Sequence, residues 1–196
     1  VCFPEMRKAG VGLCVATQLA GCMKPASPVG SHDTPEQAWQ ATQRQLAWYR
    51  QMEQFGELVQ LTTWEQVQTQ IHCWEEAPEN SPIGYILSLE GTDSLRTLDD
   101  LHSAYEYGLR AVGPAHYGMG RYAPGHDKDS KFPQRGKDLL KAMDQLGMIL
   151  DVTHLCEKAF WEALDIYEGP IWASHSNSRA IVDDARQLHD EQIKAL

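Results

Sequence analysis

The chain has 196 residues, 42% of them hydrophobic, with a formal net charge of -10 at pH 7 and a pI near 5.2. A chain of this length buries one sizeable core, so we expect a single domain over residues 1–196. The acidic balance argues against a nucleic-acid partner, because nucleic-acid-binding proteins gather Lys and Arg on one face. No apolar run is long enough to cross a bilayer.

Five cysteines are spread along the chain without a Cys-x-x-Cys pair: Cys2, Cys14, Cys22, Cys73 and Cys156. An odd number at wide spacing indicates neither a disulfide scaffold nor a zinc knuckle. We therefore expect mostly buried thiols in a reducing compartment. This favours the cytoplasm, although a signal peptide would lie before Val1 and is not visible.

The first predicted strand is Val11–Leu19, and a helix signal follows it. Thr34 is the expected N-cap, with Pro35 in the first turn and Gln37 closing a capping box. Apolar residues then recur at helical spacing until Gly56 ends the run.

A short strand, Leu58–Thr62, comes next, and Thr63 with Gln66 forms a second capping box that opens another helix. Both helices carry aromatic residues at the spacing of a helix face packed on a sheet, which predicts core positions for Trp39, Trp48, Tyr49, Trp64 and Trp74.

The rest of the chain alternates strands and helices. Three further helical patterns end at Gly108, Gly147 and Gly169, as expected where a left-handed C-cap returns the chain to a sheet. Four apolar runs are the remaining strands: Ile83–Glu90, Leu109–His116, Met148–His154 and Ile171–His175.

Six strands, nearly all followed by a helix, predict a parallel α/β sheet. The sequence holds neither G-x-G-x-x-G nor a Walker motif, which argues against a doubly wound nucleotide-binding fold. We therefore predict a (β/α)8 TIM-like barrel. A complete barrel takes about 250 residues. Because the chain starts at Val1 without methionine and stops at Leu196 within a helix-like segment, we expect a partial barrel without its first and last strands.

Four predicted strands end on a side chain that binds metals or protons: Glu90, His116, His154 and His175. The carboxyl ends of parallel barrel strands lie on one rim, so these side chains are expected to converge there. A carboxylate that can bridge two cations, together with histidines, suits zinc and predicts a binuclear metal hydrolase. For each residue alone, the competing interpretation is a polar side chain that ends a strand and is solvated. The position of all four at the same end of successive strands favours the metal site.

Other polar residues near this rim are more ambiguous. Asp151 lies three residues before His154, so strand alternation turns it to the opposite face, where a structural role or an indirect contact with a ligand is open. The long connection Gly118–Arg135 is either an active-site lid or a mobile loop. Arg186 follows the last strand closely, where a guanidinium can hold a substrate carboxylate. Solvated positions are expected for the remaining histidines: His32, His72, His102, His126 and His189.

Several stretches carry a likeness to a known family: Tyr85–Asp93 (YILSLEGTD), Tyr105–Arg110 (YEYGLR), His116, Leu146–His154 (LGMILDVTH) and Ser174–Arg186 (SHSNSRAIVDDAR). They resemble the membrane (renal) dipeptidase family, peptidase family M19 of the amidohydrolase superfamily. The likeness runs from Phe3 to the end of the chain. The order and similar spacing of the Glu-Gly, Thr-His and Ser-His-Ser elements make it specific.

The resemblance implies a zinc-dependent dipeptidase with two zinc ions in the complete protein. By position, Glu90 would bridge both ions, and His154 and His175 would bind the second. His116 would be catalytic, binding the substrate carbonyl and stabilising the oxyanion. Arg186 would bind the C-terminal carboxylate of the dipeptide, although the residues after it depart from the family's Arg-Asn-hydrophobic-Pro-Asp pattern. A hydroxide that bridges two zinc ions would attack the peptide bond.

Two elements of the family have no counterpart in this sequence. The His-x-Asp pair of the first strand would precede Val1, and the proton-handling aspartate of the last strand would follow Leu196. We therefore expect the isolated chain to be inactive. Two alternatives stay open: another amidohydrolase reaction, on a lactone, a cyclic amide or an N-acyl amino acid, and a metal-free scaffold on the same fold. A homodimer is one option for the assembly.

Overall fold

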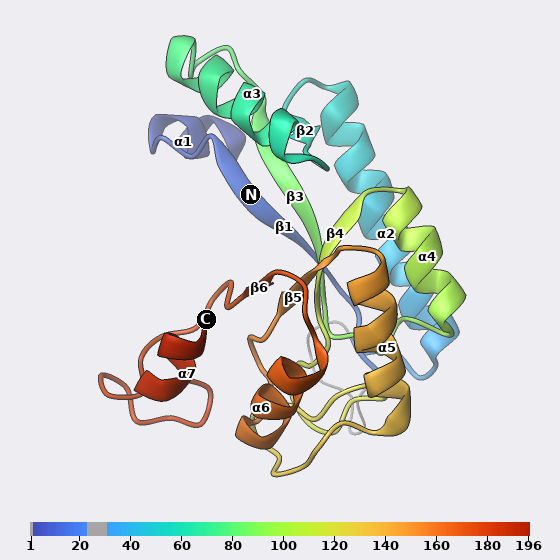
Figure 1. The fold of residues 1–196 in the computed structure, drawn as a ribbon. Coiled ribbons are helices and arrows are strands. Elements are labelled where there is room, and N and C mark those ends of the chain that lie inside the picture. Colours follow the sequence, from blue (N-terminus) through green and yellow to red (C-terminus); the bar gives the residue numbers. More distant parts are fainter. Residues whose placement is uncertain (1, 23–30) are drawn as a thin grey trace.

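The computed structural model describes residues 2–22 and 31–196, and in these ranges six parallel strands form one sheet (Figure 1). The strands are β1 (Leu13–Leu19), β2 (Leu58–Gln60), β3 (Ile83–Glu90), β4 (Leu109–Gly113), β5 (Ile149–Asp151) and β6 (Ile171–Trp172). The helices are α1 (Phe3–Lys8), α2 (Pro35–Gln54), α3 (Trp64–Glu76), α4 (Leu98–Glu106), α5 (Gln134–Gln145), α6 (Glu157–Ile166) and α7 (Asp190–Ala195). The predicted parallel α/β sheet is confirmed.

Local signals in the sequence set the helix starts. The Thr63 hydroxyl accepts from the Gln66 amide, and the Gln66 side chain accepts from the Thr63 amide, so the predicted capping box of α3 is confirmed. At α2 the Thr34 cap is also confirmed, but the Gln37 side chain accepts from the amide of Asp33 instead of closing the box on Thr34. In both cases a side-chain oxygen satisfies an amide that the helix leaves unpaired.

The strand order places two strands on the same edge of β3. β1 pairs along one edge of β3, whereas β2 and β4 divide the other edge between them, β2 near the start of β3 and β4 near its end. Backbone hydrogen bonds show this: the Ile83 amide donates to Glu57 beside β2 (2.9 Å), and the Gly91 amide donates to Gly113 of β4 (2.8 Å). The sheet therefore has five successive strands in the order β1-β3-β4-β5-β6. β2 lies off this order and pairs only with the start of β3, on the edge that β4 also uses.

Helices α2, α4 and α5 cover one face of the sheet. Tyr85 and Leu87 of β3 point to this face and are fully buried, and the Tyr85 ring stacks on Tyr49 of α2 with centroids 5.3 Å apart. Figure 1 shows α2, α4 and α5 side by side along the sheet, and the contacts of α4 with β4 and of α5 with β5 agree with this arrangement. The apolar side chains of this sheet face and of the helices on it are buried against each other, and this burial stabilises the packing of the helices on the sheet.

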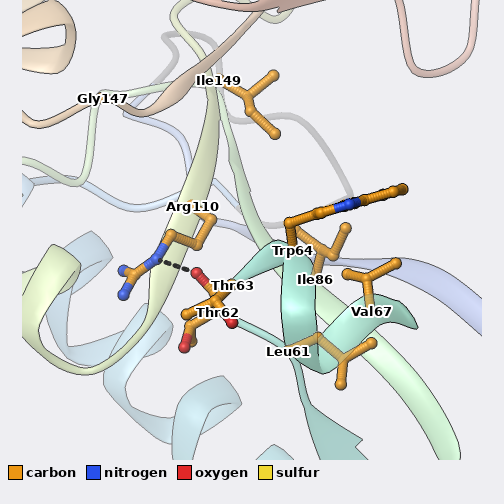
Figure 2. A pocket seen from close by; sticks show the side chains of 9 residues that line it. All are labelled: Leu61, Thr62, Thr63, Trp64, Val67, Ile86, Arg110, Gly147 and Ile149. Atoms are coloured by element: carbon orange, nitrogen blue, oxygen red, sulfur yellow. Dashed lines mark hydrogen bonds between the residues drawn. The ribbon is translucent and has the colours of Figure 1, made fainter. Parts of the chain in front are cut away.

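The opposite, inner face of the sheet is only partly covered. Leu13 and Val15 of β1 point there and are 37% and 40% exposed. An open hollow of about 240 Å³ lies on this face. Figure 2 shows the residues that line it: Leu61, Thr62, Thr63, Trp64, Val67, Ile86, Arg110, Gly147 and Ile149. The indoles of Trp64 and Trp48 are 64% and 41% exposed, so their prediction as core residues is wrong. Trp64 is the first residue of α3 and lies at the open hollow.

The polar groups of this hollow are already engaged. Arg110 donates to the carbonyls of Thr62, Tyr105 and Leu109 and lies over the Tyr105 ring. The Thr62 hydroxyl donates to the Gln66 side chain, and the Thr63 hydroxyl accepts from the Gln66 backbone amide. A ligand site needs convergent polar groups, and here they hold backbone in place. We interpret the hollow as uncovered sheet interior.

All five cysteines are free thiols, and only Cys156 is buried. The prediction of mostly buried thiols is therefore wrong: Cys73 lies on the solvent side of α3, and Cys2 is exposed just before α1. Among the described residues, no helix has both the length and the apolar character that crossing a membrane requires.

Candidate metal centre

The four rim residues predicted from the sequence converge. Around the Glu90 carboxylate oxygen Oε1, the Nε2 atom of His154 lies at 2.8 Å, that of His175 at 3.2 Å and that of His116 at 3.7 Å. The Nε2 atoms of His154 and His175 are 3.3 Å apart. Donor atoms of Glu90, His116 and His154 all lie within 4.8 Å of one another, close enough to share one cation.

The histidines reach this point from loops and do not end strands. β4, β5 and β6 stop at Gly113, Asp151 and Trp172, so His116, His154 and His175 lie three residues beyond their strands. The sequence prediction placed them on the strands, because the residues that follow an apolar run do not show where the backbone pairing with the neighbouring strand ends. The rim position is nevertheless right, since each loop leaves from the carboxyl end of its strand.

His154 has an unusual backbone. Its φ is 71°, and it is the only residue other than glycine with a positive φ among the described ones. A left-handed conformation costs about 1–2 kcal/mol for a residue with a Cβ. A bond from the Leu155 amide to the Val152 carbonyl (3.1 Å) and a bridge between Leu155 and Gly125 hold this turn in place. Strain of this kind gathers at functional sites, where the backbone aims a side chain.

Burial and charge fix the protonation of the cluster. Burial lowers the pKa of His154 more than the hydrogen bond to Glu90 raises it. Burial likewise lowers the pKa of His116, and the nearby His154 lowers it further. Burial raises the pKa of Glu90, but the hydrogen bond from His154 and the charges of the three histidines outweigh it, so the Glu90 pKa is lowered. Near neutral pH Glu90 is thus a carboxylate and His116 and His154 are neutral imidazoles, the protonation state that metal binding requires.

Arg186 also reaches the rim, as predicted. Its Nη2 atom donates to the His175 carbonyl (2.9 Å) and lies 3.4 Å from His154 Nε2, and its Nη1 atom is 3.4 Å from the Ser176 hydroxyl. Burial lowers the pKa of Arg186, and the phenol of Tyr117 and the carboxylate of Glu90 act in the opposite direction. A guanidinium is thus held beside the candidate metal ligands.

Sequence reasoning missed His126. Its Nδ1 atom lies 3.3 Å from His154 Nδ1, so it is not a solvated loop residue, and its ring meets Tyr117 edge-on with centroids 4.9 Å apart. Burial lowers its pKa, and the charge of Arg186 adds to this effect. A histidine in an irregular loop leaves no periodic signal; the available clue was that its loop starts at the rim, directly after His116.

The loop that carries His126 is packed against the body of the protein. Tyr122 and Ala123 are buried, the Gly125 amide donates to Gly118 (2.7 Å), and the Cys156 thiol donates to the Ser130 carbonyl (3.0 Å). The interpretation as a merely mobile loop is therefore disfavoured by these contacts. Of the other histidines, His72 and His102 are exposed on α3 and α4, as predicted.

Asp151 also departs from its predicted orientation. Because His154 lies outside the strand, alternation along β5 does not set their relative direction. The Asp151 carboxylate accepts from the Ser174 hydroxyl, and the Ser174 oxygen is 2.7 Å from His175 Nδ1. Asp151 therefore points to the same rim as the histidines.

The donor set fits a zinc ion. One carboxylate and two or three neutral imidazoles are the nitrogen and oxygen ligands that zinc prefers. The strained backbone of His154 and the approach of three Nε2 atoms to one carboxylate oxygen are arrangements that a shared cation stabilises.

Comparison with known proteins agrees with this site. The sequence profile of the family described as membrane dipeptidase, peptidase family M19, matches residues 1–196. The chain belongs to this family. An uncharacterised protein of Acinetobacter calcoaceticus, from the PQQ-III 3′ region, is 35% identical over 174 residues, which are 83% of this chain and 53% of that protein. The chain thus spans about half the length of this curated relative.

Two solved M19-like structures share the fold. Dipeptidase AC, a metallopeptidase of family M19, aligns with a TM-score of 0.80 and 23% identity over 100% of this chain and 59% of that one. A metallopeptidase of Rhodobacter sphaeroides, solved with a phosphinate mimic of the dipeptide L-Ala-D-Ala, aligns with a TM-score of 0.78 and 23% identity over 100% of this chain and 61% of that one. The barrel-like α/β fold of the M19 family is thereby confirmed, and this chain forms part of it.

Proposed function

We propose that this chain carries the metal-binding and substrate-binding half of a zinc-dependent dipeptidase. The observation that carries the proposal is the meeting of His116, His154 and His175 at one oxygen of Glu90, in a chain that belongs to the M19 family. The Rhodobacter sphaeroides relative, solved with a dipeptide mimic, supports a dipeptide as the substrate class.

Glu90, His154 and His175 are the proposed zinc ligands. Three protein ligands leave a position open for water or substrate, as in catalytic zinc sites. Zinc held there would supply Lewis acidity toward the peptide carbonyl and would activate water near neutral pH; two ions are proposed in the complete protein, with Glu90 as a ligand of both.

His116 is the proposed catalytic donor. Its Nε2 atom is the most distant of the three from Glu90, at 3.7 Å, and its side chain is 27% exposed, more than His154 at 5% and less than His175 at 47%. Because it lies farthest from the shared oxygen, its N–H can donate to the carbonyl oxygen as negative charge develops. Because burial lowers its pKa, the imidazole is neutral at pH 7 and needs no charge to do so.

Arg186 is the proposed anchor for the substrate. Its guanidinium lies at the rim beside His154 and His175, and a carboxylate can accept two hydrogen bonds from it. An anchor at this place selects short peptides, since the free C-terminus must lie within one residue of the scissile bond.

Metal analysis and a substrate panel test the proposal in the complete gene product. We expect zinc to copurify, L-Ala-D-Ala and other dipeptides to be hydrolysed, and activity to fall sharply when the C-terminal carboxylate is amidated. Arg186→Gln should raise KM for the free dipeptide and leave the zinc content unchanged. Hydrolysis of lactones or N-acyl amino acids in preference to dipeptides would point to another amidohydrolase reaction, and a zinc-free protein would contradict the proposal.

A further inference from the structure

Asp151 joins the carboxyl ends of β5 and β6 below the candidate metal centre. It is 5% exposed, and its Oδ1 atom accepts from the backbone amides of Thr153 (3.1 Å) and Ser174 (3.2 Å). Its other oxygen, Oδ2, accepts from the Ser174 hydroxyl. The bond to Thr153 is an Asx turn, an ordinary structural role that accounts for Oδ1. It does not account for the direction of Oδ2.

The bond at Oδ2 decides which ring nitrogen of His175 carries the proton. A serine hydroxyl has a single proton, and here it is donated to Asp151, so the Ser174 oxygen is left as an acceptor. His175 Nδ1 lies 2.7 Å from that oxygen and must therefore carry the proton of the neutral ring. The lone pair is then on Nε2, the atom that lies 3.2 Å from Glu90 and 3.3 Å from His154.

We propose that Asp151, acting through Ser174, is a positioning residue that selects the tautomer and the ring direction of His175 for cation binding. The inference rests on the proposed zinc site and adds two residues to it that are not ligands. Partners of this kind change metal affinity by about 10–100-fold when they are removed.

Asp151→Asn makes a specific prediction because the backbone amides fix the side-chain orientation. The Asn oxygen has to stay with the amides of Thr153 and Ser174, which need an acceptor, so its NH2 group faces the Ser174 hydroxyl. Ser174 then accepts from Asn and donates to His175 Nδ1. The proton of the neutral His175 ring moves to Nε2, the nitrogen that should bind the cation.

Ser174 gives an independent pair of variants. It is exposed, so Ser174→Ala should fold, and it removes the link and leaves His175 free to populate both tautomers. Ser174→Thr keeps the hydroxyl and should restore the wild-type behaviour. Ser94→Ala is the matched control, because Ser94 is a buried serine whose hydroxyl meets no hydrogen-bond partner among the described residues.

The test is the tautomer of His175 in the metal-free 196-residue chain, read from ¹⁵N shifts of labelled histidine at pH 8, followed by zinc affinity measured by chelator competition. We expect the Nδ1–H tautomer of His175 in the wild type, in Ser174→Thr and in Ser94→Ala. Ser174→Ala should show a mixture of the two tautomers, and Asp151→Asn should show the Nε2–H tautomer. Zinc affinity should fall about 10–100-fold in Ser174→Ala and in Asp151→Asn only. Unchanged tautomer and affinity in both variants, with normal zinc binding by the wild type, overturn the positioning role. A wild-type chain that shows the expected tautomers but binds no zinc contradicts the proposed function instead.

Discussion

Gly125→Ala should damage the loop beside the candidate metal centre. A Cβ atom at this position would lie 2.1 Å from the His116 carbonyl oxygen, 3.0 Å from the Gly118 oxygen and 3.1 Å from the Gly118 nitrogen. All three are backbone atoms, so no side-chain rotation can relieve the collision. The segment must move by at least about 1.3 Å to reach ordinary contact distance, which places strain on both His116 and the neighbouring His126.

The cost follows from the contacts that such a shift breaks. The bond from the Gly125 amide to Gly118 (2.7 Å) and the bridge between Gly125 and Leu155 lie at the collision. Overpacking costs about 1–3 kcal/mol, and each lost hydrogen bond adds about 1 kcal/mol. We therefore expect a loss of about 2–4 kcal/mol in the free energy of unfolding, or roughly 4–16 °C in Tm for a chain of this size.

Urea denaturation of the 196-residue chain measures this cost. Gly113→Ala is the matched control, since its Cβ would approach nothing nearer than 3.6 Å although it lies just as near the site. We expect Gly113→Ala to stay within about 1 kcal/mol of the wild type. If Gly125→Ala is as stable as Gly113→Ala, the packing of this loop against His116 is not as described.

Three further predictions concern the rim. His154→Gly should be more stable than His154→Ala by about 1 kcal/mol in urea denaturation, because only glycine adopts a φ of 71° without strain; equal stabilities would contradict the strain. Burial lowers the pKa of His154 and His116 below 6.5, so the folded protein binds protons at these residues less readily than the unfolded protein does. The contribution of the two neutral imidazoles to the free energy of unfolding is therefore present above pH 6.5. It is lost as the pH falls through their lowered pKa values. NMR titration of the metal-free chain should find both imidazoles titrating below 6.5, and values above it would refute the burial argument. Arg179 donates to the carbonyls on either side of Arg186, so Arg179→Gln should raise KM for dipeptides in the complete gene product while zinc affinity stays unchanged; an unaltered KM would show that Arg186 is held by other contacts.

The sequence was sufficient to predict the sheet, the helices after α1 and the rim. Strand–helix alternation indicates a parallel sheet, and a parallel sheet brings Glu90 and the three histidines to one edge whatever the length of each strand. This is why the convergence of these side chains was predicted correctly although the strand ends were placed too far along the chain. Arg186 lies at the rim for the same reason, because it follows β6 closely. Of the three predicted left-handed C-caps, Gly108 and Gly147 have a positive φ; the prediction for Gly169 is wrong, because α6 already ends at Ile166 with an extended residue, Tyr167.

Contacts made by loops could not be predicted. Alternation along a strand says nothing about a residue beyond its end, so the direction of Asp151 relative to His154 was wrong. His126 depends on where a long loop packs, and that is set by distant partners such as Leu155. The exposure of Trp64 has a similar cause: helical spacing identifies a face but not whether the sheet extends beneath its first turn.

Zinc binding by the 196-residue chain and its Glu90→Gln variant tests the metal centre most directly. Gln keeps the shape of the side chain but removes the negative charge that three imidazoles surround, and Glu162→Gln serves as control because Glu162 is a buried carboxylate that pairs with Lys137. By calorimetry we expect about one zinc ion per wild-type chain, unchanged binding in Glu162→Gln, and an affinity at least about 100-fold weaker in Glu90→Gln. Equal zinc affinity in the wild type and Glu90→Gln would contradict the account.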